Sequence, residues 1–152
     1  MIDPHLRQRV IRNAQNRCEY CRISQAAVPL HTFHVEHIVA RQHGGEDDPA
    51  NLCLACHRCN AYKGSNLTAI DPATGEVVSL FHPRRETWRE HFVLNGAEVV
   101  GLTPVGRATV RLLHMNDHPR LSLRAECLTL GELPGDEAQD MRRARENHAG
   151  IE

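Results

Sequence analysis

Four cysteines in two pairs are the residues of this sequence best suited to bind a metal ion. Cys18 with Cys21 and Cys56 with Cys59 both have the spacing Cys-x-x-Cys. Four thiolates arranged as two such pairs form the ligand set of a closed, tetrahedral, structural zinc site. The stretch between the pairs is longer than in a compact zinc ribbon, so we expect a folded element between them. The sequence therefore predicts a structural Zn²⁺ site.

The other two cysteines compete with this assignment. Cys53 and Cys56 also have the Cys-x-x-Cys spacing, and only one of the two pairs that contain Cys56 completes a four-ligand site. Because Cys53 lies in an alternating apolar stretch, we interpret it as a small buried hydrophobic residue. Cys127 stands alone in an apolar helical pattern, and we interpret it in the same way.

Between the two cysteine pairs, an acidic residue and a histidine stand next to each other at Glu36 and His37. Phosphodiester hydrolysis needs a water that is deprotonated near neutral pH and a cation that stabilises charge on the phosphorane and the leaving oxygen. A neutral imidazole beside a metal-binding carboxylate supplies both. Consecutive residues of a strand point to opposite faces, so a strand must end or bulge here if both are to serve one site.

The segment that contains this pair is HVEHIVARQHGGEDDPANLCLACHRCNAYKG, residues 34–64. It resembles the HNH endonuclease motif of the His-Me finger, or ββα-metal, superfamily, in the variant whose two Cys-x-x-Cys pairs bracket the motif. Glu36 and His37 match the acidic-His pair, Asn51 matches the middle asparagine, and Asn60 matches the closing position. The likeness continues through residues 66–92 and 101–116.

The resemblance implies a metal-dependent endonuclease that hydrolyses DNA, with His37, Glu36, Asn51 and Asn60 as its catalytic residues. His37 would be the general base, Asn51 would brace the loop that holds it, and Glu36 with Asn60 would bind one divalent cation. Many family members have His in place of Asn60 and Asp in place of Glu36. An amide and a carboxylate favour a hard ion, so we expect Mg²⁺ or Mn²⁺ and leave the choice between them open.

Four basic residues are candidates for contacts with the nucleic-acid backbone, against the alternative of ordinary solvated surface: Arg41, Lys63, Arg84 and Arg85. The formal net charge is only −1, so the composition neither supports nor excludes a DNA partner. Trp88 would join such an interface, although a core anchor is the stronger interpretation. His34, His43 and His57 are further ligand candidates near the motif. A structural role is the stronger interpretation for His34, and simple exposure to solvent is the stronger one for His57.

The elements that must position these residues predict an α+β fold built on a ββα-metal finger. We expect strands over residues 30–39 and 51–55, followed by a helix over 56–63 that Gly64 closes. Before this unit, Asp3 and Pro4 should begin a helix that ends before Cys18. After it we expect strands at 67–70, 76–81 and 97–102 and helices at 84–92, 103–115 and 119–130.

The length suits one domain, and we expect a single HNH nuclease domain over residues 1–134, with its motif core at 18–64. Residues 135–152 are polar and should form a frayed tail. No apolar run is long enough to span a bilayer and the first fifteen residues are polar, so we expect a cytoplasmic protein without a membrane partner.

Two other functions compete with a DNA endonuclease. A non-catalytic zinc-knuckle module would bind nucleic acid or protein, but the four motif residues at the family spacing argue against it. A nuclease of the same fold could act on RNA, because nothing in the motif reads the 2′-hydroxyl. We expect double-stranded DNA as the partner, and a homodimer if both strands are to be cut together.

Overall fold

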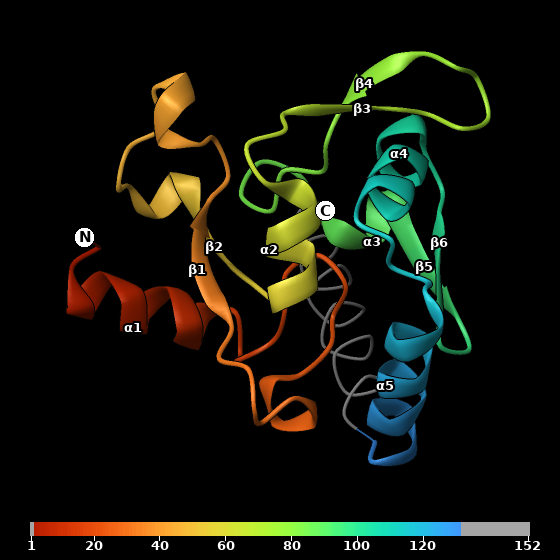
Figure 1. Ribbon diagram of the computed structural model, residues 1–152, viewed down its shortest axis with the longest axis horizontal. Helices are drawn as coiled ribbons and strands as arrows, with labels where there is room; N and C mark the ends of the chain where they lie inside the picture. The colour runs from red at the N-terminus through yellow and green to blue at the C-terminus, as the bar shows by residue number, and fades with distance from the viewer. Residues whose placement is uncertain (1, 132–152) are drawn as a thin grey trace, which may run out of the picture.

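The computed structural model describes residues 2–131, in which short helices accompany three two-stranded antiparallel sheets (Figure 1). The α+β class is therefore confirmed. The strands pair in chain order: β1 (His34–His37) with β2 (Leu52–Ala55), β3 (Thr68–Ile70) with β4 (Val77–Ser79), and β5 (Phe92–Asn95) with β6 (Glu98–Gly101). The α-helices of the described part are α1 (Pro4–Asn13), α2 (His57–Lys63), α3 (Trp88–His91), α4 (Pro104–Leu112) and α5 (His118–Thr129).

Local capping explains where several helices begin. The Asp3 carboxylate accepts hydrogen bonds from the amides of His5 and Leu6 at the start of α1. The Thr103 hydroxyl accepts from the amide of Gly106 at the start of α4. Both helices begin at a proline directly after the capping residue, as the sequence predicts.

The predicted order of strand, loop, strand and helix is confirmed in the segment that carries the motif. In the β1–β2 pair, Glu36 lies opposite Cys53 and His37 lies opposite Leu52. Helix α2 follows directly and packs against both strands, and α1 also contacts them. Figure 1 shows this hairpin with α1 on one side and α2 on the other. The two strands therefore lie between these two helices.

The strand predicted over residues 30–39 is shorter in the structure. The side chain of Gln25 donates to the carbonyls of Val28 and His31 and accepts from the amide of Phe33. These bonds hold the approach to β1 as a loop, because the backbone groups that would extend the ladder are already bound. Strand β1 therefore begins only at His34.

The helix predicted over residues 84–92 is also mostly wrong. His82 Nδ1 accepts hydrogen bonds from the amides of Arg84 and Arg85, which holds this segment in a turn, and α3 spans Trp88–His91 only. Phe92 already belongs to β5, a strand that we did not predict. Its signal was the pair Asn95-Gly96, typical of a hairpin turn, and Gly96 has the positive φ of 60° that such turns need.

Helix α4 contacts β3, β4, β6 and α3 and so connects the elements that follow the finger. A Cβ at Gly106 would lie 2.0 Å from the His91 carbonyl oxygen, so only glycine permits this approach of α4. Arg107 on the same helix forms an ion pair with Asp71, which also caps the turn between β3 and β4.

The predicted tail, residues 135–152, lies outside the described residues. Within 2–131, no helix is both long and apolar enough to cross a membrane.

Candidate zinc centre and active site

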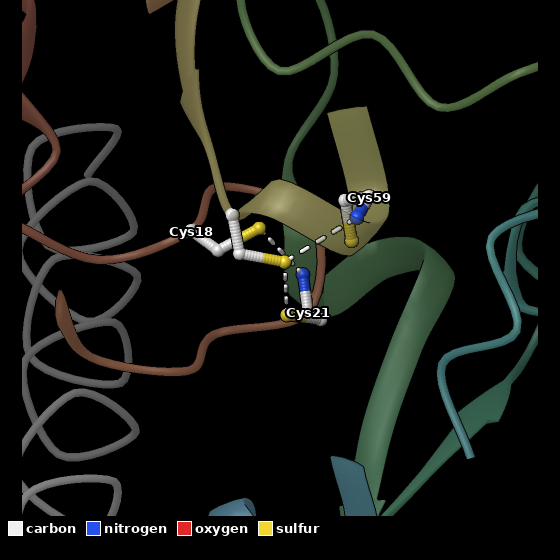
Figure 2. A group of neighbouring side chains, drawn as sticks. Cys18, Cys21 and Cys59 are labelled. Carbon is white, nitrogen blue, oxygen red and sulfur yellow. Dashed lines mark hydrogen bonds between the residues drawn. The ribbon is translucent and has the colours of Figure 1, made fainter. Parts of the chain in front are cut away.

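The four cysteines of the two Cys-x-x-Cys pairs come together in the interior. The sulfur atoms of Cys18, Cys21, Cys56 and Cys59 all lie within 4.8 Å of one another, and the distance from Cys21 Sγ to Cys56 Sγ is 3.7 Å. Figure 2 labels three of the four, Cys18, Cys21 and Cys59. A tetrahedral zinc ion with Zn–S bonds of about 2.3 Å separates its sulfur ligands by about 3.8 Å. The cluster therefore fits a structural zinc site, and Cys53 is not part of it.

Backbone geometry supports the same interpretation. The amide of Cys21 points to Cys18 Sγ at 3.5 Å, and the amide of Cys59 points to Cys56 Sγ at 3.4 Å. Each pair thus folds as a small knuckle in which the chain's own N–H groups face the first sulfur. Cys56 is at the same time the N-cap of α2, so one residue fixes both the zinc centre and the helix that follows.

A second, polar site opens next to β1. A cleft of about 430 Å³ is lined by residues from β1, the following loop and α2. Glu36, His37 and Asn60 are all among its lining residues, together with Arg41 and the exposed His34. The structure therefore brings three of the four predicted catalytic residues to one cleft.

His37 is the last residue of β1, so it lies where the chain leaves the strand and its direction need not follow the alternation. Its Nε2 atom lies 2.6 Å from Oδ1 of Asp47. The Arg41 guanidinium donates to both oxygens of the same carboxylate, at 3.0 and 3.1 Å. The hydrogen bond with His37, followed by that with Arg41, lowers the pKa of Asp47. We did not predict Asp47, and its signal was an acidic residue after the loop's Gly44-Gly45 pair.

Asn51 ties this loop together. Its side chain accepts from the amide of Val39 at 2.8 Å and donates to the carbonyls of Val39 and Glu46, both at 3.0 Å. Gly45 packs under these bonds, since a Cβ there would lie 1.7 Å from the Val39 carbonyl oxygen. Asn51 does not line the cleft itself, but it holds the loop that carries Asp47 and Arg41.

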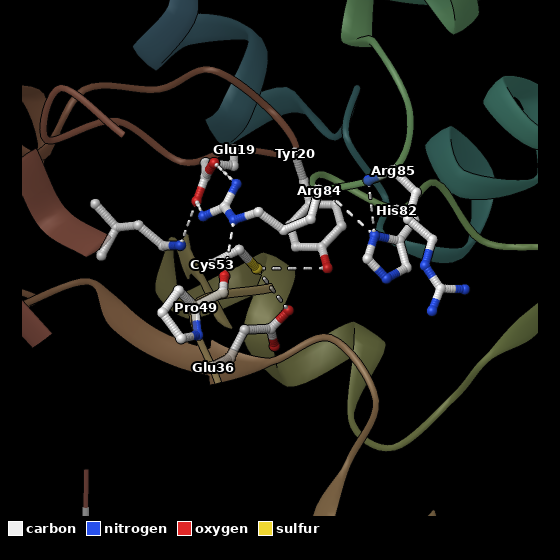
Figure 3. Close-up of polar contacts among 9 residues, drawn as sticks. Glu19, Tyr20, Glu36, Pro49, Cys53, His82, Arg84 and Arg85 are labelled. Atoms are coloured by element: carbon white, nitrogen blue, oxygen red, sulfur yellow. Dashed lines mark hydrogen bonds and ion pairs between the residues drawn. The ribbon is translucent and has the colours of Figure 1, made fainter. Parts of the chain in front are cut away.

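Glu36 is only 7% exposed, although it belongs to the wall of the cleft. Figure 3 shows its carboxylate beside Cys53, whose sulfur lies 3.6 Å from Glu36 Oε1 and 3.7 Å from the Tyr20 hydroxyl. Lys63 Nζ lies 3.9 Å from the same carboxylate oxygen. Burial raises the pKa of Glu36 to about 7, and the positive charge of Lys63 opposes this shift. Cys53 is therefore a buried residue, as the sequence predicts. Its contact with Glu36 was not predicted.

Two of the four basic candidates are committed to contacts inside the protein. Lys63 is buried, and its ammonium also donates to the His37 carbonyl at 3.3 Å. Arg84 donates to both carboxylate oxygens of Glu19, at 2.5 and 2.8 Å (Figure 3). The structure thus favours an internal role for each over the predicted phosphate contact. Arg41 and Arg85 are exposed and stay candidates.

The remaining aromatic and histidine candidates have ordinary surroundings. Trp88 is buried and donates from Nε1 to the Tyr20 carbonyl at 2.8 Å, which agrees with a core anchor. His34 and His57 are exposed with ring centroids 6.0 Å apart, and His43 is exposed in the loop. Among the described residues, only the cysteine cluster gathers three or more His, Cys, Asp or Glu ligand atoms.

Comparison with known protein families finds a match, and it covers the segment that carries the cysteine pairs and the cleft. The family model described as HNH endonuclease matches residues 18–66, a segment that contains both cysteine pairs, β1, β2 and α2. No curated protein and no solved structure matches the chain. Residues 18–66 therefore match the HNH endonuclease family, as the motif indicates, and this match supports a nuclease-type function in general.

Proposed function

We propose that the protein is a metal-dependent endonuclease that hydrolyses DNA phosphodiester bonds, with His37 as the general base. The observation that carries this proposal is the arrangement of His37 in the cleft that Glu36 and Asn60 also line, with its imidazole bound to Asp47. A histidine on a carboxylate, next to oxygen ligands and open to solvent, is the arrangement that water activation requires.

Asp47 supports the role of His37 through the imidazole's tautomer. An ionised carboxylate only accepts hydrogen bonds, so Nε2 of His37 carries the proton in this contact. Nδ1 then keeps the lone pair with which a general base removes a proton from water. Arg41 also binds the Asp47 carboxylate and lines the same cleft, so it lies within reach of a phosphate bound there.

The donor set of the cleft fits a hard divalent cation. Glu36 and Asn60 would hold it, and the remaining positions would go to water and phosphate, as Mg²⁺ and Mn²⁺ prefer. When bound, such an ion stabilises negative charge on the phosphorane and on the leaving oxygen. Glu36 is suited to this role because it is a buried carboxylate that the single charge of Lys63, at 3.9 Å, compensates only in part.

Three finer parts of the proposal concern the substrate, the oligomeric state and the extent of the domain. Double-stranded DNA is proposed as the substrate, with Arg41 and Arg85 as backbone contacts. A homodimer would place two active sites for cleavage of both strands. The nuclease domain is proposed to extend over residues 1–134, because the core that supports the finger includes side chains from β5, β6 and the end of α4.

The direct test incubates the purified full chain with supercoiled plasmid, single-stranded DNA and a structured RNA, each with Mg²⁺, Mn²⁺ or EDTA. We expect nicking or linearisation of the plasmid that EDTA abolishes. Cleavage of RNA alone would replace the proposed substrate with RNA while the chemistry stands. Binding of all three nucleic acids without cleavage under any metal would contradict the proposal and favour a binding module.

A further inference from the structure

The zinc cluster has a neighbour that lies far from it in the sequence and outside the HNH match. Arg120, on α5, donates from Nη2 to Cys59 Sγ at 2.7 Å and lies 3.5 Å from Cys56 Sγ. Its other terminal nitrogen donates to the Leu113 carbonyl. The side chain is fully buried. Helix α5 therefore brings a positive charge directly against two of the four zinc ligands.

A buried guanidinium needs a buried negative charge. Arginine keeps its proton in proteins, so Arg120 is charged even in the interior. Four neutral thiols would leave that charge uncompensated, whereas four thiolates around one Zn²⁺ carry a net charge of about −2. The position of Arg120 is thus explained by a metal-bound cluster, in which its N–H groups stabilise the thiolates of Cys59 and Cys56.

Arg120 also lies at the side from which the cluster is accessible. Cys56 is 6% exposed, whereas Cys18, Cys21 and Cys59 are completely buried. A pocket of about 290 Å³ next to the cluster is lined by Cys56 and Arg120, among others. A chelator or an oxidant that enters this pocket would meet Cys56 first, beside a guanidinium that competes for its sulfur lone pairs.

We propose that Arg120 is part of the zinc centre and retains the ion, by hydrogen bonding to Cys59 and Cys56 and by neutralising part of the cluster's charge. The C-terminal helix α5 is then a functional piece of the zinc site. If the cysteines only formed part of an ordinary groove, without a metal ion, no buried cation would be needed at this position. This inference does not depend on the proposed nuclease activity.

The same helix offers a matched control. Arg124 lies one turn further along α5 and is equally buried, but it donates to the Ala97 carbonyl at 2.7 Å, to Asn116 Oδ1 at 3.0 Å and to the Met115 carbonyl. Replacing either arginine with methionine removes a buried charge and loosens α5. Only the Arg120 change removes a donor from the sulfur atoms.

The test is the rate at which zinc passes from the folded, full-length protein to a colorimetric chelator. We expect Arg120→Met to release zinc about 10- to 100-fold faster than wild type, since partners of metal ligands commonly change affinity by that factor. Arg124→Met should release it at nearly the wild-type rate, and circular dichroism should show both variants folded at the start. The zinc-loaded Arg120→Met protein should also react with a thiol reagent faster than the Arg124→Met protein, which should react at nearly the wild-type rate.

Equal release rates for Arg120→Met and Arg124→Met would overturn the proposal, because the effect would then come from loosening of α5. If the methionine variants do not fold, Arg120→Lys and Arg124→Lys keep the charge and provide the same comparison. A lysine at position 120 offers a point charge without the planar fork, so faster release than from Arg124→Lys is expected. Release no faster than from Arg124→Lys would also overturn it.

Discussion

Nε2 of His37 lies 2.6 Å from Oδ1 of Asp47, a residue ten positions further along the chain. The loop between them is closed by Asn51 and by the tight packing of Gly45, so the pair depends on the fold of the loop and not on strand geometry. In the proposed mechanism this contact sets the tautomer of His37. Asp47 is then a positioning residue, and its effect on the reaction is measurable.

Asp47→Asn should lower the cleavage rate by roughly 10-fold, less than loss of the base itself. The reason is that an asparagine at position 47 no longer presents an ionised acceptor to Nε2 of His37. The measurement is the plasmid cleavage rate at fixed pH and metal concentration. The control is Glu46→Gln, which removes the same charge from an exposed position in this loop. An equal loss of rate in both variants would show that only the loop's net charge matters.

Cys53 and Cys56 test the zinc assignment, because one contacts Glu36 and the other lies in the sulfur cluster. Cys53→Ser should retain one zinc ion per chain, whereas Cys56→Ser should lose zinc and cooperative folding together. Elemental analysis and thermal unfolding measure both. Our ligand set is wrong if Cys53→Ser loses the metal while Cys18→Ser keeps it.

Asn51→Asp should lower both stability and rate. The aspartate keeps an acceptor for the Val39 amide but places an oxygen where the Nδ2 donor now meets the carbonyls of Val39 and Glu46. Unsatisfied polar groups of this kind cost about 1–3 kcal/mol each. Denaturant unfolding should show the loss. Wild-type stability with a reduced rate would instead place Asn51 in the chemistry.

Asp71 gives a prediction for stability against pH. Its hydrogen bonds with Arg107, in first place, hold its pKa well below the ordinary range of an aspartate. Because the pKa is lower in the folded state, the ion pair stabilises the protein fully at pH values above the pKa of Asp71 in the unfolded chain, near 4. This stabilisation is lost as the pH falls below that value. The difference in Tm between wild type and Asp71→Asn should be constant from about pH 7 to 5 and shrink below about pH 4. A difference that grows on acidification would contradict this assignment.

The sequence was most informative where chemistry depends on local spacing. The paired cysteines, the capped helices α1, α2 and α4, and the adjacency of Glu36 and His37 are all readable from short segments. What could not be predicted depends on packing between distant segments. The burial of Lys63 beside Glu36 follows from the seating of α2 on β1, and no spacing rule reports it.

Two further residues show the same limit. Asp47 reaches His37 only because the loop folds back, and Arg120 reaches the cysteines across 61 residues of chain. An arginine in a helix is ordinarily solvated, so nothing in the sequence pattern indicates that Arg120 is buried. Its burial depends on the packing of α5 against the cysteine cluster.

His37→Ala is the variant that decides the proposed mechanism. It should reduce plasmid cleavage by roughly 10²- to 10⁴-fold, the usual contribution of a general base, while zinc content, thermal unfolding and DNA binding stay near wild type. His5→Ala, an exposed histidine on α1, is the matched control and should cleave like wild type. Added imidazole should restore part of the His37→Ala activity, because a small base can occupy the vacated space. A wild-type cleavage rate in His37→Ala, from a preparation shown to be free of contaminating nuclease, would contradict the assignment of His37 as the base.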